Sequence, residues 1–191
     1  MGASRYTLLG AALVLVLGGA AAAAGYLLRE HLQGPPPAPP QAATTMGLPE
    51  LPRPRPQFVL RDRHGELRSV TEWDGRLLLL NFWATWCPPC REEIPMLMEV
   101  HDEYAEQGVQ LVGVAIDERK NVLDFVTEMG MDYPVLIGQL PAIEVSKAYG
   151  NRVGSLPFTV LVNREGQIVY QKLGELTRAE AETAIREALG G

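Results

Sequence analysis

The sequence predicts an α/β domain with a mixed β-sheet, and three observations lead to that fold class. Two continuous apolar runs, Leu77 to Phe82 and Val109 to Ile116, are typical of strands buried on both faces. A helical pattern follows each run, so strands and helices alternate along the chain. Near the C-terminus, Phe158 to Val162 and Gln167 to Leu173 flank turn residues 163–166 and indicate an antiparallel hairpin.

Residues 1–32 are predicted to be a signal anchor that crosses a membrane once. The segment from Thr7 to Leu28 is uncharged and almost wholly apolar, and about 20 such residues span a bilayer core. We therefore expect a single-pass protein of the cell inner or plasma membrane, with its C-terminal domain in the periplasm or otherwise outside the cytoplasm. A cleaved signal peptide is the alternative, because Ala20 to Ala24 offers small-residue cleavage sites.

Residues 33–57 are predicted to be a proline-rich linker. They hold nine of the fifteen prolines and show no hydrophobic period, which favours an extended spacer. The folded domain is then expected over residues 58–191. Its remaining predicted elements are a hairpin over 58–60 and 67–70, helices over 89–107, 121–129, 141–149 and 177–189, and a short strand over 133–137.

The composition excludes several classes of function. The net charge of −6 and the pI near 5.1 argue against a nucleic-acid-binding protein, which needs a basic surface. Two cysteines cannot form a scaffold of several disulfides, and a four-thiolate zinc site would need a second Cys-x-x-Cys pair. The histidines, His31, His64 and His101, are scattered along the chain. We expect neither a metal nor an organic cofactor.

Both cysteines stand in one motif, Trp86-Cys87-Pro88-Pro89-Cys90, between an apolar strand and a helical pattern. A thiol at a helix N-terminus faces unpaired backbone N–H groups and the positive end of the helix dipole. That environment favours the thiolate, which is the attacking species in disulfide exchange. The spacing therefore predicts dithiol–disulfide chemistry, with two ordinary buried cysteines as the alternative.

From Phe58 to Gly191 the sequence resembles the thioredoxin fold. The buried strand that ends in the Cys-Pro-Pro-Cys motif, Pro95 inside the following helix, and the later segment Gly154 to Thr159 match landmarks of that fold in order. The segment from Glu118 to Ile137 looks like an inserted helix and strand. Together with the anchor, the linker and an extra N-terminal β-hairpin, it resembles the TlpA/ResA/CcmG group of membrane-anchored thiol–disulfide oxidoreductases.

The resemblance implies roles for the cysteines and for one glutamate. Cys87 is expected to be the exposed nucleophile and Cys90 the shielded resolving thiol. In the group a glutamate stands three residues after the second cysteine, and Glu93 occupies that position as a candidate proton carrier. The alternative is that Glu93 lies in the first helical turn only because carboxylates are stabilised there. Asn81 departs from thioredoxins, which have a buried aspartate at its position, so the task of accepting a proton moves to Glu93.

The substrate-binding residues are expected to be Trp86, Pro88, Leu156 and Pro157. The resemblance implies a cis peptide bond between Leu156 and Pro157, which would place backbone polar groups beside Cys87 for an extended client segment. Trp86 is expected on the docking surface, although burial alone could explain a tryptophan. The alternative for Pro157 is an ordinary proline at the start of a strand.

The combined expectation is an extracytoplasmic reductase of protein disulfides. Two prolines remove N–H donors from the first helical turn, so thiolate stabilisation is moderate, which favours a reductant. The expected partners are a disulfide-bearing client, such as apocytochrome c or a copper-site protein, and a membrane-embedded electron donor. A disulfide oxidase or isomerase is one alternative, and a copper-binding Cys-x-x-Cys module is another. Arg61, Arg63 and Arg68 are expected to mark a solvated face of the hairpin.

Overall fold

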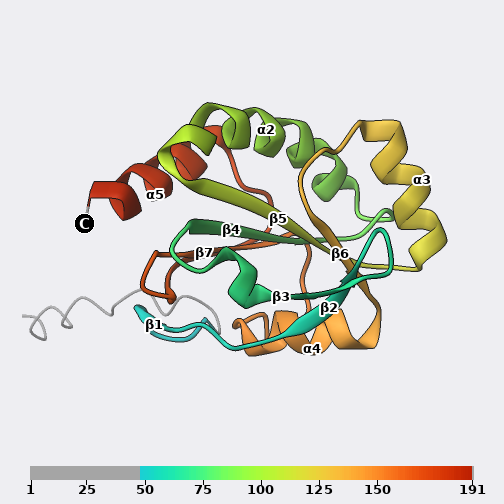
Figure 1. Cartoon of the computed structure of the whole chain (residues 1–191), viewed down its shortest axis with the longest axis horizontal. Coiled ribbons are helices and arrows are strands. Elements are labelled where there is room, and N and C mark those ends of the chain that lie inside the picture. The colour runs from blue at the N-terminus through green and yellow to red at the C-terminus, as the bar shows by residue number, and fades with distance from the viewer. Residues whose placement is uncertain (1–47, 191) are drawn as a thin grey trace, which may run out of the picture. The chain divides into compact units, whose positions relative to one another are not determined.

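The computed structural model describes residues 48–190, which form an eight-stranded sheet with helices on both faces (Figure 1). The strand order is β1-β8-β7-β4-β5-β6-β2-β3. The strands are β1 (Arg53–Pro54), β2 (Val59–Asp62), β3 (Leu67–Ser69), β4 (Leu77–Trp83), β5 (Val109–Ile116), β6 (Val135–Gly138), β7 (Phe158–Val162) and β8 (Gln167–Leu173). The helices are η1 (Val70–Trp73), α2 (Pro88–Tyr104), η2 (Ala105–Gln107), α3 (Arg119–Met129), α4 (Leu140–Ala148) and α5 (Arg178–Gly190).

The centre of the sheet is mixed, as the sequence predicts. Strand β4 pairs in parallel with β5 and antiparallel with β7, and β5 pairs in parallel with β6. Successive side chains of a strand point to opposite faces. Leu77 and Leu79 accordingly join one buried cluster while Leu78 and Leu80 join the other. The continuous apolar run therefore serves two cores, one on each face of the sheet.

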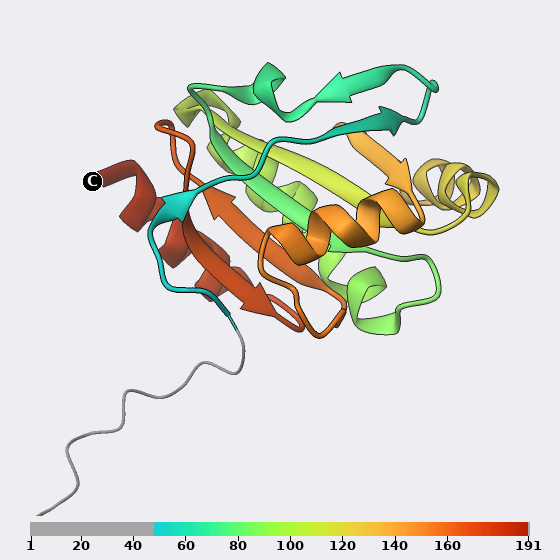
Figure 2. The same cartoon turned by 90° about the horizontal axis from the view of Figure 1, so that it is seen from below.

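Helices cover the two faces unequally. Helices α2, α3 and α5 contribute buried side chains to the core on one face, and α4 contributes Ala142 to the core on the other face. Figure 2 shows the sheet from the side that α4 crosses. Helix α2 continues through Pro95, and the inserted helix and strand expected between Glu118 and Ile137 are α3 and β6. The predicted α/β thioredoxin fold is confirmed.

The folded domain begins before residue 58, so the predicted boundary is too late. Strand β1 pairs antiparallel with β8, which makes it an edge strand of the sheet. An edge position tolerates prolines, because one side of the strand needs no N–H donors. Arg55 is buried, forms an ion pair with Asp74, and donates its backbone N–H to Gly166 at 2.9 Å. Residues 48–57 are thus part of the domain rather than a free spacer.

The predicted anchor over residues 1–32 and the linker residues 33–47 lie outside the described residues. Among the helices of residues 48–190, none has the length and apolar character needed to cross a bilayer.

Candidate active site

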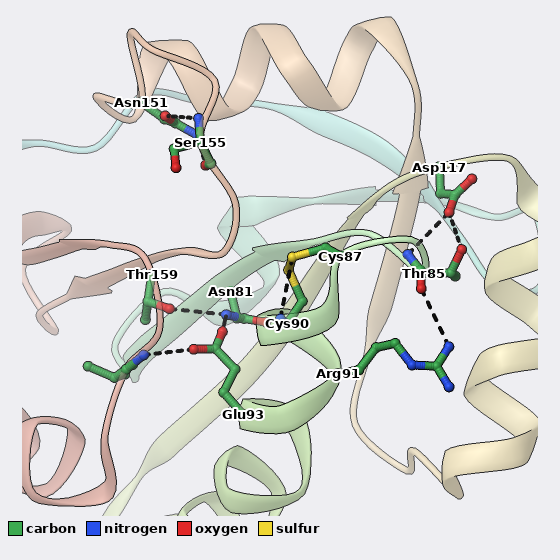
Figure 3. Close-up of a disulfide and its surroundings, with 11 residues drawn as sticks. Asn81, Thr85, Cys87, Cys90, Arg91, Glu93, Asp117, Asn151, Ser155 and Thr159 are labelled. Carbon is green, nitrogen blue, oxygen red and sulfur yellow. Dashed lines mark hydrogen bonds between the residues drawn. A yellow bond between two sulfur atoms is a disulfide. The ribbon is translucent and has the colours of Figure 1, made fainter.

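Cys87 and Cys90 form a disulfide at the junction between β4 and α2 (Figure 3). Strand β4 ends at Trp83, and α2 begins at Pro88 with Cys87 as its N-cap residue. Strand β4 lies in the middle of the sheet and is held by neighbouring strands on both sides. The cysteines follow its carboxyl-terminal end, so their position is fixed by the sheet. The strand-to-helix junction expected from the motif is confirmed.

The two sulfurs are less accessible than the sequence suggests. Cys90 is fully buried as predicted, but only 4% of Cys87 is exposed, so the expectation of an openly exposed Cys87 is wrong for the disulfide form. Cys87 and Cys90 both belong to the buried cluster that also contains Ala84. Cys87 remains the more accessible of the pair.

One backbone donor serves the Cys87 sulfur. The N–H of Cys90 points to Cys87 Sγ at 3.3 Å, which confirms the donor expected at this helix start. Pro88 and Pro89 have no N–H to contribute. A thiolate at Cys87 would consequently receive one backbone hydrogen bond together with the helix dipole.

Glu93 lies buried one helical turn after Cys90, and only 2% of its surface is exposed. Its carboxylate accepts a hydrogen bond from Asn81 Nδ2 at 2.7 Å and another from the backbone N–H of Leu176 at 2.8 Å. Burial raises the pKa of Glu93 from 4.5 to about 7, although both hydrogen bonds act in the opposite direction. Residues three apart share one helix face, so the carboxyl of Glu93 lies on the same side of α2 as Cys90.

Asn81 connects Glu93 to the neighbouring strand β7. Its side-chain Nδ2 donates both to Glu93 and to Thr159 Oγ1, the latter at 3.0 Å (Figure 3). Its Oδ1 is buried and has no hydrogen-bond partner within residues 48–190. An amide at this position has no proton to release, so Asn81 can orient Glu93 but cannot replace it as an acid or base.

Leu156 and Pro157 lie at the same edge of the sheet as the cysteines. Phe158 is paired with Phe82 near the end of β4, so the residues just before β7 face the loop that leads to Cys87. The peptide bond between Leu156 and Pro157 is cis, as expected. The Pro157 carbonyl accepts from the N–H of Gly174 at 2.9 Å, whereas the Leu156 backbone has no hydrogen-bond partner within residues 48–190.

The side chains of Trp86 and Pro88 flank Cys87 on the surface. Trp86 is 66% exposed and Pro88 is also exposed, which agrees with the expected docking surface. Trp83 is fully buried and packs against Phe125 with ring centroids 5.3 Å apart, so it belongs to the core.

Asp117 holds the loop before Cys87, a link that the sequence analysis missed. Its Oδ2 accepts from the backbone N–H of Thr85 at 3.1 Å and from the Thr85 hydroxyl (Figure 3). Its Oδ1 accepts from Asn121 at 3.3 Å. Asp117 directly follows the buried strand β5, at the edge where β4 also ends. The sequence pattern that could have predicted this contact is an acidic residue directly after a buried parallel strand.

The side chains described for residues 48–190 include no cluster of three or more His, Cys, Asp or Glu that could hold a metal ion.

The family model described as Redoxin matches residues 53–186 of the chain. The chain belongs to the Redoxin family. The matched range begins at β1, which agrees with the domain boundary seen in the fold.

This Redoxin-family chain is similar to proteins named thiol-disulfide oxidoreductase ResA. It is 39% identical to that of Halalkalibacterium halodurans over 126 residues, which cover 65% of this chain and 69% of the relative. It is 36% identical to that of Geobacillus thermodenitrificans over 126 residues, which cover 65% and 70% respectively.

Among solved structures, the chain resembles a thiol:disulfide interchange protein of the thioredoxin family from Chlorobium tepidum. The TM-score is 0.66 and the identity 28%, over 74% of this chain and 99% of the other. With the disulfide at the start of α2, these similarities make the Redoxin-family protein a thiol–disulfide oxidoreductase of the ResA type.

Proposed function

We propose that the protein reduces disulfides in client proteins outside the cytoplasm, anchored to the inner or plasma membrane by residues 1–32. The observation that carries the proposal is the Cys87–Cys90 disulfide at the start of the helix that also bears the buried carboxyl of Glu93, whose pKa is raised to about 7. A carboxyl with this pKa suits a proton carrier for a thiol at neutral pH. The apolar segment from Thr7 to Leu28 supports the anchor.

The proposed reaction has two exchange steps. The Cys87 thiolate attacks one client sulfur, so a bond between Cys87 and the client forms as the client disulfide breaks and releases one thiolate. Cys90 then gives its proton to Glu93 and attacks Cys87 Sγ, which forms the Cys87–Cys90 disulfide and frees the second client thiolate. The client gains two electrons, and the protein's dithiol loses them.

Client binding is proposed to use the surface around Cys87. The unpaired backbone of Leu156 can exchange hydrogen bonds with an extended client segment, as in strand addition. Trp86 and Pro88 supply apolar surface next to the attacked sulfur. Apocytochrome c and copper-site proteins are the proposed clients. Because the compartment is oxidising, we also propose a membrane-embedded donor that returns the dithiol to its reduced form.

The direction of electron flow can be tested by the reduction potential. A strong oxidant needs a reduced form in which the attacking thiolate is highly stabilised. Here Cys87 receives one backbone hydrogen bond, from Cys90, and no histidine stands between the cysteines. We expect a glutathione titration to give a potential below about −200 mV. A value near −120 mV, typical of a strong oxidase, would contradict the reductase proposal.

The order of attack can be tested by trapping. Cys90→Ser should accumulate mixed disulfides between Cys87 and clients, because the second exchange step is blocked. Mass spectrometry of the trapped species would identify the clients. Cys87→Ser is the matched control and should trap none; equal trapping by both variants would contradict the assigned roles.

A further inference from the structure

A pocket of about 410 Å³ lies at the edge of the sheet where β5 and β6 end. Its lining comes from Arg61 of β2, Asp117 after β5, Arg119 at the start of α3, and residues 137–141. Trp83, the last residue of β4, pairs with Ala115 of β5. The next residue of β5, Ile116, pairs with Gly138, the last residue of β6. The pocket is therefore about 10 Å, or two strand spacings, from the end of β4.

Two arginines of the pocket have no carboxylate partner within the described residues. The guanidinium groups of Arg61 and Arg119 donate to backbone carbonyls of residues 62–65, at distances from 2.6 to 3.1 Å. Arg68 of the same hairpin differs, because it forms ion pairs with Asp62 and Glu72. Neutral carbonyls fix the two guanidinium groups in place without cancelling their charge, and further N–H groups remain for a carboxylate.

The carboxylate in the pocket wall, Asp117, forms no ion pair with these arginines, and with one carboxylate against two guanidinium groups the pocket keeps a net positive charge. One oxygen accepts from the backbone N–H and hydroxyl of Thr85, and the other accepts from the N–H of Glu118 at 2.6 Å and from Asn121. Since Thr85 stands two residues before Cys87, the same contacts join the pocket wall directly to the loop that carries the nucleophile.

The rest of the wall is apolar. Leu140, at the first position of α4, is 73% exposed, and Ile137 and Pro141 line the pocket next to it. The side chain of Gln139 makes no capping hydrogen bond to α4, and Pro141 has no N–H, so the N–H groups of Leu140 and Ala142 are those without a side-chain partner. A negatively charged group with an apolar neighbour would satisfy both kinds of surface.

We propose that this pocket is a second contact site for clients, which binds an acidic side chain flanked by an apolar one a few residues from the attacked cysteine. The inference rests on the proposed function, since the occupant is a segment of the disulfide-bearing client. The span of about 10 Å reaches the end of β4 at Trp83, four residues before Cys87, and an extended chain covers that distance in about three residues. The site would select clients by the sequence around the disulfide, in addition to the contacts beside Cys87.

The test uses synthetic peptides, each with one internal disulfide, and the reduced full chain. Asp, Asn or Lys next to Leu is placed two to five residues from the disulfide on either side. Single-turnover rates over a range of peptide concentrations separate binding from chemistry. At one or more positions we expect the Asp peptide to bind about three- to ten-fold more tightly than the Asn peptide, with the same maximal rate.

Variants then assign that preference to the pocket. Arg61→Gln with Arg119→Gln should bring the Asp-to-Asn ratio close to one and leave the reduction of the Asn peptide unchanged. Arg164→Gln is the matched control, because Arg164 also donates to a backbone carbonyl, that of Gln107 at 2.9 Å, but stands in the β7–β8 turn. It should retain the preference.

Two results would overturn the inference: equal binding of the Asp, Asn and Lys peptides at every position, or a preference that survives in the double variant. If the double variant does not fold, the wild type still decides, because an ionic preference must decline as salt rises. Failure to reduce any peptide, including the Asn peptide, would instead count against the proposed reductase function.

Discussion

Glu93 lowers the stability of the folded chain at neutral pH, because its buried carboxyl must ionise inside the protein. Its pKa is about 7 in the folded state and 4.5 as the ordinary value. Between these pH values the folded chain holds a proton that the unfolded chain has released. The free energy of unfolding therefore falls as pH rises through this window, and the effect is complete above it. The largest cause of the raised pKa is burial.

Replacement of Glu93 by glutamine should remove this pH dependence. Between pH 5 and pH 8 we expect the wild type to lose on the order of 3 kcal/mol relative to Glu93→Gln, measured by urea unfolding of the oxidised protein. The new amide can donate to Asn81 Oδ1, which lacks a partner, if the Asn81 side chain turns over. Glu92→Gln, which changes an exposed carboxylate, is the control and should follow the wild type.

Asn81→Asp should split the titration of the site into two steps. The substitution places a second carboxylate where Nδ2 now lies 2.7 Å from Glu93 Oε1, and two carboxylates this close cannot both ionise easily. The rate at which Cys90 resolves a mixed disulfide should then show inflections on both sides of pH 7. The wild type should show one inflection near pH 7, and Glu93→Gln should show none near that pH. A single unchanged inflection in Asn81→Asp would contradict the coupling.

At the scale of elements, β1 shows how an apparently unstructured segment completes the sheet. Arg53 pairs with Ile168 across the β1–β8 edge, and the Tyr149 hydroxyl donates to the Pro56 carbonyl at 2.8 Å. Leu48 and Leu51 pack against the core on the α4 face. These contacts come from residues that read as a linker, because prolines conceal the strand pattern.

Removal of β1 should therefore destabilise the domain. We expect a chain that starts at residue 58 to have a free energy of unfolding about 2–5 kcal/mol lower than one that starts at residue 48, since it loses hydrogen bonds and buried leucine surface. Urea unfolding of the two forms measures the difference. Equal stabilities would show that β1 contributes nothing to the fold.

The whole molecule shows which features a sequence can predict. The buried strands and the Cys87–Cys90 motif could be predicted because they depend on local patterns. Glu93 was predicted from the resemblance, because the group has a glutamate three residues after the second cysteine. The pairing of β2 with β6 and of β1 with β8 joins distant segments that carry no matching local signal. For the same reason the sequence could not predict that Asn81 and the Leu176 backbone donate to Glu93. Nor could it predict that Asn81 also donates to Thr159.

The proposed anchor and donor make a prediction for the whole molecule in cells. If electrons come from a membrane-embedded donor, attachment to the membrane raises the effective concentration of the protein at that donor. The full chain should then hold Cys87 and Cys90 mainly as thiols. A secreted form that starts at residue 48 should be mainly oxidised, because it retains the fold but meets the donor less often in an oxidising compartment.

Rapid acid quenching followed by alkylation of free thiols and a gel shift measures the two redox states. A form in which an unrelated membrane-spanning helix replaces residues 1–32 is the control, and it should recover the reduced state if attachment alone matters. Equal reduction of the secreted form and the full chain would contradict a membrane-embedded donor, although the reductase chemistry at Cys87 would stand. The comparison thus separates the source of the electrons from the exchange reaction that uses them.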